Sequence, residues 1–219
     1  MPHTVDTLRL PPLYGVSHYV MRWFYEAFFR GDVAGTENLP EHGPFIIAAN
    51  HLSYLDPPFV GSYVPRLMRP FARKTLWSGG IVSWWLDGVG CIPVDREAGD
   101  IGAIKRVLQA LQGNCGLILF PEGTRSRDGR LQKPKSGVGL MACRTGAAVV
   151  PARIFGSFEA FPRGRKLPRF GTPVSVIYGR PLYPADYDDP AAGKARYDVA
   201  AERIMARIAA LPKPEYAVI

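Results

Sequence analysis

Short apolar runs that alternate with segments of helical periodicity are the feature that most restricts the fold of this chain. Phe45–Ala49, 116–120 and 147–154 are such runs, and the first two lead directly into polar clusters. Almost wholly apolar runs of this length are typical of strands that are buried on both faces of a sheet. We therefore expect an α/β fold in which a central mixed sheet is flanked by helices and the functional residues lie along one edge.

The remaining elements are placed by the same periodicities and by turn residues. Further strands are predicted at 33–38, 69–74, 91–94 and 173–178, and helices at 13–30, 58–64, 77–89, 100–112, 135–145 and 194–211. The 23 glycines and 21 prolines are dispersed between these elements and form no linker. At 219 residues, the chain is expected to form a single domain with a substantial core.

A histidine and an aspartate follow the first apolar run. His51 and Asp56 are five residues apart, and a continuous helix would separate them by roughly 140°. Pro57 favours a turn before it and a helix after it. Asp56 is then expected at a helix N-cap, where its carboxylate can accept the Nδ1 proton of His51 and leave Nε2 as a general base. Taken alone, the pair also fits a helix cap beside a histidine with a structural role.

Three further blocks follow the stretch Asn50-His51-Leu52-Ser53-Tyr54-Leu55-Asp56. They are Gly90-Cys91-Ile92-Pro93-Val94-Asp95-Arg96, Phe120-Pro121-Glu122-Gly123-Thr124-Arg125-Ser126 and Val149-Val150-Pro151. In this order, the four blocks closely resemble those of the glycerolipid acyltransferase family, and most closely those of the bacterial 1-acyl-sn-glycerol-3-phosphate (lysophosphatidic acid) acyltransferases. The resemblance covers residues 35–182. It departs from the family pattern at Thr75, where an acidic residue commonly follows the lysine, and at Ala152 in the fourth block.

The resemblance implies a reaction. The histidine that matches His51, oriented by Asp56, deprotonates an acceptor hydroxyl, which attacks an acyl thioester carried on coenzyme A or acyl carrier protein. The expected acceptor is the sn-2 hydroxyl of lysophosphatidic acid, and the product is phosphatidic acid for phospholipid biosynthesis. Another lysolipid or an amino-acid-linked lysolipid is an alternative acceptor. A catalytically silent membrane-binding protein is a third interpretation, against which the intact motif residues count.

Six residues are predicted to bind substrate. Two arginines suit the acceptor phosphate, because a guanidinium offers a bidentate fork; their alternative role is in ion pairs, for instance with Glu122. The full set is Lys74, Arg96, Glu122, Gly123, Thr124 and Arg125. No metal or other cofactor is expected, since the four histidines show no metal-ligand spacing. No G-x-S-x-G elbow supports a serine hydrolase, although Ser53 lies inside the first block.

Positive charge is concentrated in one segment. Residues 125–169 hold eleven Lys and Arg against two acidic residues, whereas the rest of the chain holds 16 basic and 17 acidic residues. Such a segment can meet an anionic membrane or a phosphorylated substrate, or be only a solvated face. Because no nucleic-acid-binding signature accompanies it, we expect membrane lipids, a lysophospholipid acceptor and an acyl thioester donor as partners, and no nucleic acid.

The N-terminal part of the chain is aromatic and amphipathic. Residues 13–30 predict a helix with one polar stripe, too interrupted to span a bilayer. Such a helix can pack in the core or lie in the membrane interface. We divide the chain into a membrane-associating helical segment, 1–31, and an acyltransferase domain, 32–219. Three cysteines cannot all pair, which favours a reducing compartment. The expected location is therefore peripheral or monotopic, on the cytoplasmic face of the membrane, with the oligomeric state left open.

Overall fold

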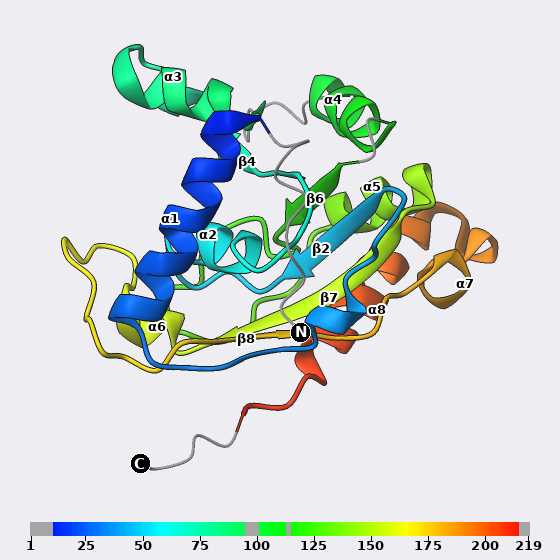
Figure 1. The fold of residues 1–219 in the computed structure, drawn as a ribbon. Coiled ribbons are helices and arrows are strands. Elements are labelled where there is room, and N and C mark those ends of the chain that lie inside the picture. Colours follow the sequence, from blue (N-terminus) through cyan, green and yellow to red (C-terminus); the bar gives the residue numbers. More distant parts are fainter. Residues whose placement is uncertain (1–10, 95–100, 113–114, 215–219) are drawn as a thin grey trace.

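The computed structural model describes residues 11–94, 101–112 and 115–214, and its centre is a six-stranded mixed sheet (Figure 1). The strand order is β1 (Val33–Ala34), β8 (Ser175–Tyr178), β7 (Ala148–Phe155), β2 (Phe45–Ala49), β6 (Gly116–Leu119) and β3 (Met68–Arg69). Neighbouring strands are parallel except for β7 and β8, which are antiparallel. A separate two-stranded parallel sheet joins β4 (Phe71–Arg73) and β5 (Ile92–Val94). The predicted α/β class with a central mixed sheet is confirmed.

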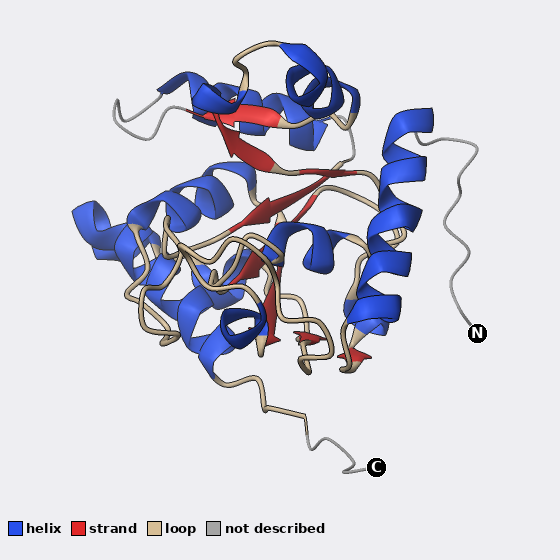
Figure 2. Cartoon of the chain, turned by 90° about the vertical axis from the view of Figure 1, so that its left-hand side faces the viewer, coloured by secondary structure: helices blue, strands red, loops and turns tan. Residues whose placement is uncertain are grey.

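Helices cover both faces of the large sheet (Figures 1 and 2). On one face lie α1 (Pro12–Phe28), α2 (Asp56–Gly61) and the short α6 (Ser157–Ala160). The other face carries α4 (Ile101–Gln112), α5 (Ser136–Thr145), α7 (Pro184–Tyr187) and α8 (Arg196–Ala209). Helix α3 (Gly80–Gly88) lies against one end of α1, at the top left of Figure 1. Short 3-10 helices occupy Thr36–Asn38, Lys74–Leu76 and Pro190–Ala195.

Strand β2 is the strand around which the two layers are built. All five of its residues are fully buried. Phe45, Ile47 and Ala49 contribute to the core beneath α1 and α2, whereas Ile46 and Ala48 contribute to the core beneath α5 and α8. Because side chains alternate along a strand, a run with no polar residue is what a strand covered on both faces requires.

Two predicted strands are shorter than expected. The strand predicted at 33–38 contains only β1, because Gly35 adopts a left-handed conformation with φ 78° and the chain turns into a 3-10 helix. The strand predicted at 69–74 is divided into β3 and β4, which belong to different sheets. Pro70 separates them. It has no N–H to donate to a ladder, and its carbonyl instead accepts the N–H of Ile92 at 2.9 Å.

Helix α1 has one face in the core and one face in solvent. Tyr14, Tyr25 and Phe29, the residue after the helix, belong to the same core cluster as β2, so the described part of the predicted 1–31 segment packs onto the rest of the fold. Its outer face exposes large apolar residues; these are Val16, Tyr19, Val20 and Trp23. Within the described residues, no helix combines the length and hydrophobicity that crossing a membrane requires.

Candidate active site

Three polar segments meet at the carboxyl edge of the sheet. The loop from Asn50 follows β2, the turn containing Glu122 follows β6, and the chain after Phe155 follows β7. In the register of these neighbouring strands, Ala48 is paired with both Leu119 and Pro151. Segments that are far apart in the sequence therefore leave the sheet side by side, which is the reason the predicted site lies at this edge.

His51 and Asp56 form a hydrogen-bonded pair. The Nδ1 atom of His51 lies 2.9 Å from Oδ2 of Asp56, which is fully buried. The same Oδ2 atom accepts the backbone N–H groups of Leu52 at 2.6 Å and Ser53 at 2.7 Å. Asp56 is the first residue of α2 and Leu55 is the N-cap, so the predicted cap position is wrong by one residue. The carboxylate nevertheless turns back toward the ring, as predicted.

The orientation of the imidazole is fixed from a second side. Its ring stacks on Phe120, with centroids 4.0 Å apart and planes inclined by 18°. With Nδ1 directed at a carboxylate, the ring carries its proton on Nδ1, and the lone pair is on Nε2. In the described part of the chain Nε2 has no hydrogen-bond partner. This arrangement suits a general base.

Glu122 ties the histidine loop to the loop that follows β6. It is 2% exposed. Its Oε1 atom accepts the backbone N–H of His51 at 3.0 Å, and its Oε2 atom accepts that of Gln132 at 3.2 Å. The N–H of Ser126 donates in turn to the carbonyl of His51 at 2.8 Å. These contacts give Glu122 a positioning role, and a direct contact with substrate stays a prediction.

The burial of Glu122 changes its acidity. Desolvation raises the pKa of this carboxyl to about 7, while the hydrogen bonds from the amides of His51 and Gln132 act in the opposite direction. The negative charges of Asp56 and Asp128 add to the increase. A carboxyl that titrates near neutral pH therefore lies directly behind the backbone of His51.

Arg125 does not pair with Glu122. Its Cζ atom lies 3.4 Å from the centroid of the Tyr54 ring, a cation–π stack. Both oxygens of Glu122 are occupied by amides, and the structure contains no salt bridge between these two described residues. The Nη1 atom of Arg125 is buried and has no hydrogen-bond partner within the described chain. The ion-pair alternative for Arg125 is thus wrong, and its guanidinium has donors available.

The structure gives fewer contacts for the other residues that are predicted to bind substrate. Gly123 has φ 67°, a left-handed conformation that suits glycine, and its N–H donates to the carbonyl of Phe120 at 2.9 Å. Thr124 is exposed beside it. Lys74 is exposed at the start of a 3-10 helix after β4, and no hydrogen bond between described residues links its side chain to His51 or Asp56. Arg96 lies outside the described residues.

Two polar residues of the histidine loop have structural partners. The hydroxyl of Ser53 donates to the carbonyl of Phe161 at 2.8 Å and accepts the N–H of Leu55 at 3.1 Å, so it is held in the loop and is not directed at His51. The side-chain amide of Asn50 donates to the carbonyl of Ile154 at 3.0 Å and accepts its N–H at 2.7 Å. Asn50 thereby joins the end of β2 to β7. The sequence contains these residues but gives no sign of these partners.

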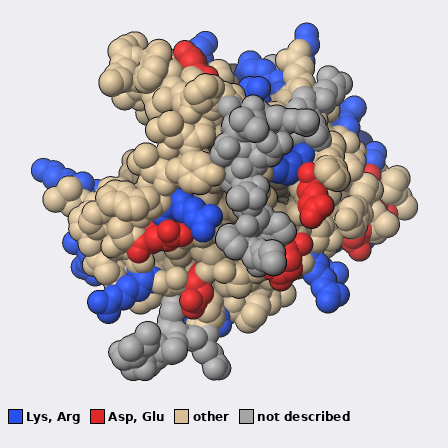
Figure 3. Space-filling view, viewed as in Figure 1, with Lys and Arg blue, Asp and Glu red and all other residues tan. Residues whose placement is uncertain are grey.

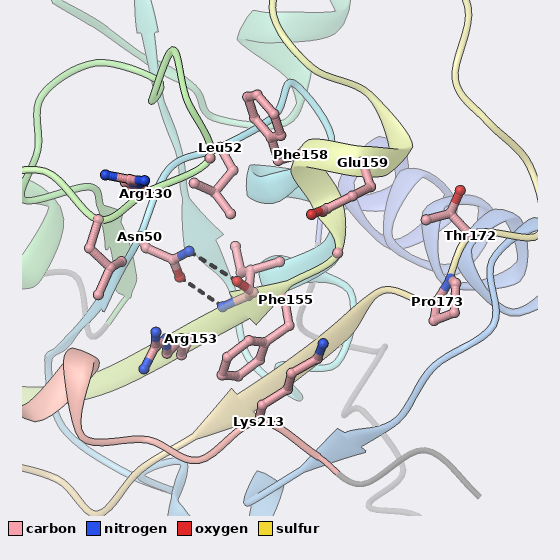
Figure 4. Close-up of a pocket in the computed structure, with 14 residues that line it drawn as sticks. Asn50, Leu52, Arg130, Arg153, Phe155, Phe158, Glu159, Thr172, Pro173 and Lys213 are labelled. Atoms are coloured by element: carbon pink, nitrogen blue, oxygen red, sulfur yellow. Dashed lines mark hydrogen bonds between the residues drawn. The ribbon is translucent and has the colours of Figure 1, made fainter. Parts of the chain in front are cut away.

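A cavity of about 640 Å³ lies beside the histidine loop (Figure 4). Asn50 and Leu52 line it, together with residues from four other segments, among them Arg130, Arg153 and Lys213. His51 is not among the lining residues, and its ring stacks on Phe120. Among the described residues, no group of three or more His, Cys, Asp or Glu is arranged to hold a metal ion.

The family follows from comparison with known sequences. The model of the Acyltransferase family matches residues 30–155, more than half of the chain. The matched region contains His51, Asp56, Glu122 and Arg125. The chain belongs to this acyltransferase family.

Two relatives within the family carry the same enzyme name. A chloroplastic 1-acyl-sn-glycerol-3-phosphate acyltransferase of Arabidopsis thaliana is 30% identical over 164 residues, covering 74% of this chain and 46% of that protein. A Streptococcus pneumoniae enzyme of the same name is 27% identical over 147 residues, covering 64% of this chain and 54% of that protein. This chain spans about half the length of the plant relatives it matches.

A solved structure extends the likeness to most of the fold. The crystal structure of the 1-acyl-sn-glycerophosphate acyltransferase from Thermotoga maritima superposes with a TM-score of 0.67 at 25% identity, covering 90% of this chain and 76% of that one. The predicted resemblance to glycerolipid acyltransferases, including bacterial ones, is confirmed.

Proposed function

We propose that this chain transfers a fatty acyl group from an acyl thioester to the sn-2 hydroxyl of lysophosphatidic acid, forming phosphatidic acid. The observation that carries the proposal is the His51–Asp56 pair, in which Nδ1 is held at 2.9 Å and Nε2 is available. The names of the relatives support the choice of acceptor. The donor is acyl-coenzyme A or acyl carrier protein.

The reaction proceeds by direct transfer. Nε2 of His51 accepts the proton of the acceptor hydroxyl as its oxygen attacks the thioester carbonyl. The buried carboxylate of Asp56 stabilises the imidazolium that forms. Collapse of the tetrahedral intermediate breaks the carbon–sulfur bond, and the thiolate takes the proton back from Nε2. No acyl-enzyme is needed, which agrees with the engaged hydroxyl of Ser53. A positioned base of this kind contributes about 10²–10⁴ to the rate.

The acceptor phosphate is assigned to Arg125. Its guanidinium is close to the catalytic loop through the stack on Tyr54, and its buried Nη1 lacks a partner among the described residues. A guanidinium fork binds a phosphate through two parallel N–H donors. Arg96, Lys74, Thr124 and Gly123 are proposed as further contacts with substrate.

The reaction requires neither metal nor cofactor on chemical grounds. A thioester already supplies an activated acyl group, and a thiolate is a competent leaving group once the oxyanion forms. The protein then has to supply a base, a binding site for the acceptor and donors for the oxyanion. The backbone N–H groups of Leu52, Ser53 and Gly123 are already hydrogen-bonded within the chain.

We place the protein at a membrane surface, as a peripheral or monotopic protein of the cytoplasmic face. The outer face of α1 exposes Trp23 by 63%, and α3 exposes Ile81 by 78% and Trp84 by 60%. The indole of Trp85 in α3 donates to Ser17 of α1 at 2.9 Å, which joins the two helices. The surface over α3 is mostly uncharged in the space-filling view, and several Lys and Arg side chains lie at the left edge below it (Figure 3). Apolar and aromatic faces beside cationic ones suit a lipid interface.

The test is an activity assay on the purified chain. Lysophosphatidate and either donor should give phosphatidate by mass spectrometry, with free thiol released in equal amount. The variant His51→Ala, shown to be folded by its melting temperature, should give none. Turnover of His51→Ala at the rate of the unaltered chain would reject the proposed function, as would transfer to other lysolipids only.

A further inference from the structure

Tyr54 differs from the other residues of the histidine loop. His51, Leu52, Ser53 and Asp56 are buried, whereas Tyr54 is 57% exposed. A large aromatic side chain at the surface of a loop that otherwise faces inward has no role in the core. Its ring instead lies under the guanidinium of Arg125, with Cζ 3.4 Å from the ring centroid.

The stack determines which donors of Arg125 remain available. A guanidinium that lies over a ring uses its face for the contact, so its N–H groups point outward in the plane of the fork. One of these nitrogens, Nη1, is buried without a hydrogen-bond partner among the described residues. A buried donor without a partner is costly. Arg125 also has no ion-pair partner among the described residues, so no carboxylate of the described chain competes with an anion for its guanidinium.

Tyr54 is itself held in place. Its ring centroid lies 5.9 Å from that of Phe161, and the carbonyl of Phe161 accepts the hydroxyl of Ser53 at 2.8 Å. The segment after α6 thus supports both Tyr54 and its neighbour. Since Tyr54 and His51 share one short loop, the guanidinium has a fixed relation to the catalytic base.

We propose that Tyr54 is a positioning residue that presents Arg125 to the phosphate of the acceptor and so favours phosphorylated lysolipids. The inference rests on the proposed function. The aromatic ring of Tyr54, and not its hydroxyl, is what positions the guanidinium of Arg125. Without the ring, the Arg125 side chain can adopt many rotamers. Binding of the phosphate then has to fix one of them, which costs conformational entropy and weakens binding.

The test compares Tyr54→Phe with Tyr54→Leu in full-length protein. Tyr54→Phe keeps the ring and should leave KM for lysophosphatidate within twofold. Tyr54→Leu should raise that KM by about 3- to 10-fold, in the range expected for a cation–π contact, with kcat within about twofold. KM for monoacylglycerol, which lacks the phosphate, should not change. In an Arg125→Ala background, Tyr54→Leu should have no further effect.

Several results would overturn the inference. These are equal losses with both acceptors, a Tyr54→Phe variant as weak as Tyr54→Leu, or additive effects with Arg125→Ala. Should Tyr54→Leu fail to fold, Tyr54→Gln makes the same comparison. If the unaltered chain forms no phosphatidate, the proposed function fails, and calorimetric binding of short-chain lysophosphatidate still decides the inference: weaker binding to Tyr54→Leu supports it and equal binding overturns it.

Discussion

Replacing Asp56 by asparagine separates two roles that a carboxylate beside a histidine can have. One oxygen, Oδ2, accepts three donors: Nδ1 of His51 and the amides of Leu52 and Ser53. The other oxygen, Oδ1, is buried and has no partner in the described structure. An asparagine that places its carbonyl oxygen at Oδ2 and its NH2 group at Oδ1 keeps all three bonds. The imidazole then retains its proton on Nδ1, so the tautomer is not lost.

What Asp56→Asn removes is the charge that stabilises the imidazolium. Two unit charges about 4 Å apart interact by roughly 4 kcal/mol at an effective dielectric constant of 20. The amide dipole retains part of this, so we expect a loss of about 2–3 kcal/mol, or roughly 30- to 200-fold in kcat. The NH2 group left buried without a partner should cost about 1–3 kcal/mol of stability.

The measured kcat and melting temperature of Asp56→Asn test these two expected losses. Asp56→Ala, which removes all three bonds, is the matched control and should lose more activity and more stability than Asp56→Asn. A kcat for Asp56→Asn as low as that of Asp56→Ala would refute the reasoning, because it would mean that the amide turns its NH2 group toward the ring and imposes the other tautomer.

Two further predictions concern Glu122 and the exposed face of α1. Burial raises the pKa of Glu122 from 4.5 to about 7; its contribution to stability is therefore fully present below pH 4.5 and is lost as the pH rises through about 7. Glu122→Gln removes this dependence, so the melting temperature of the unaltered chain minus that of Glu122→Gln should fall between pH 5 and 8, and a constant difference would contradict it. Trp23→Glu should weaken binding to lipid vesicles by roughly 10- to 100-fold, since burying a large apolar side chain contributes about 1.5–3 kcal/mol. Ala206→Glu, which adds the same charge on the exposed side of α8, is its control, and equal binding of the two variants would place the lipid contact elsewhere.

The sequence predicts the parts of this site that depend on local pattern. The apolar run of β2 is typical of a strand covered on both faces, and Pro57 favours a helix start next to Asp56. These two patterns allow His51 to pair with Asp56, which is close in the chain, but they also fit a helix cap beside a structural histidine. The resemblance of the four sequence blocks to those of the family then implies the reaction, with His51 as the base.

The sequence does not predict contacts that join distant segments. Glu122 accepts the amide of His51 across 71 positions, and Tyr54 lies under Arg125 in the same way. Both depend on β2 and β6 being neighbours and on the register of their ends. The split between β3 and β4 is also tertiary, because Pro70 alone does not say which sheet each half joins. Local patterns contain no information on such pairings.

The position of β2 in the middle of the sheet has a consequence for how the protein responds to heat. The histidine loop continues this strand, and Asn50 and Glu122 bond it to β7 and to the loop after β6. Opening such a strand requires the whole domain to open, whereas short edge strands such as β1 and β3 fray at little cost. The base therefore has no separate melting step, and catalytic competence persists until global unfolding.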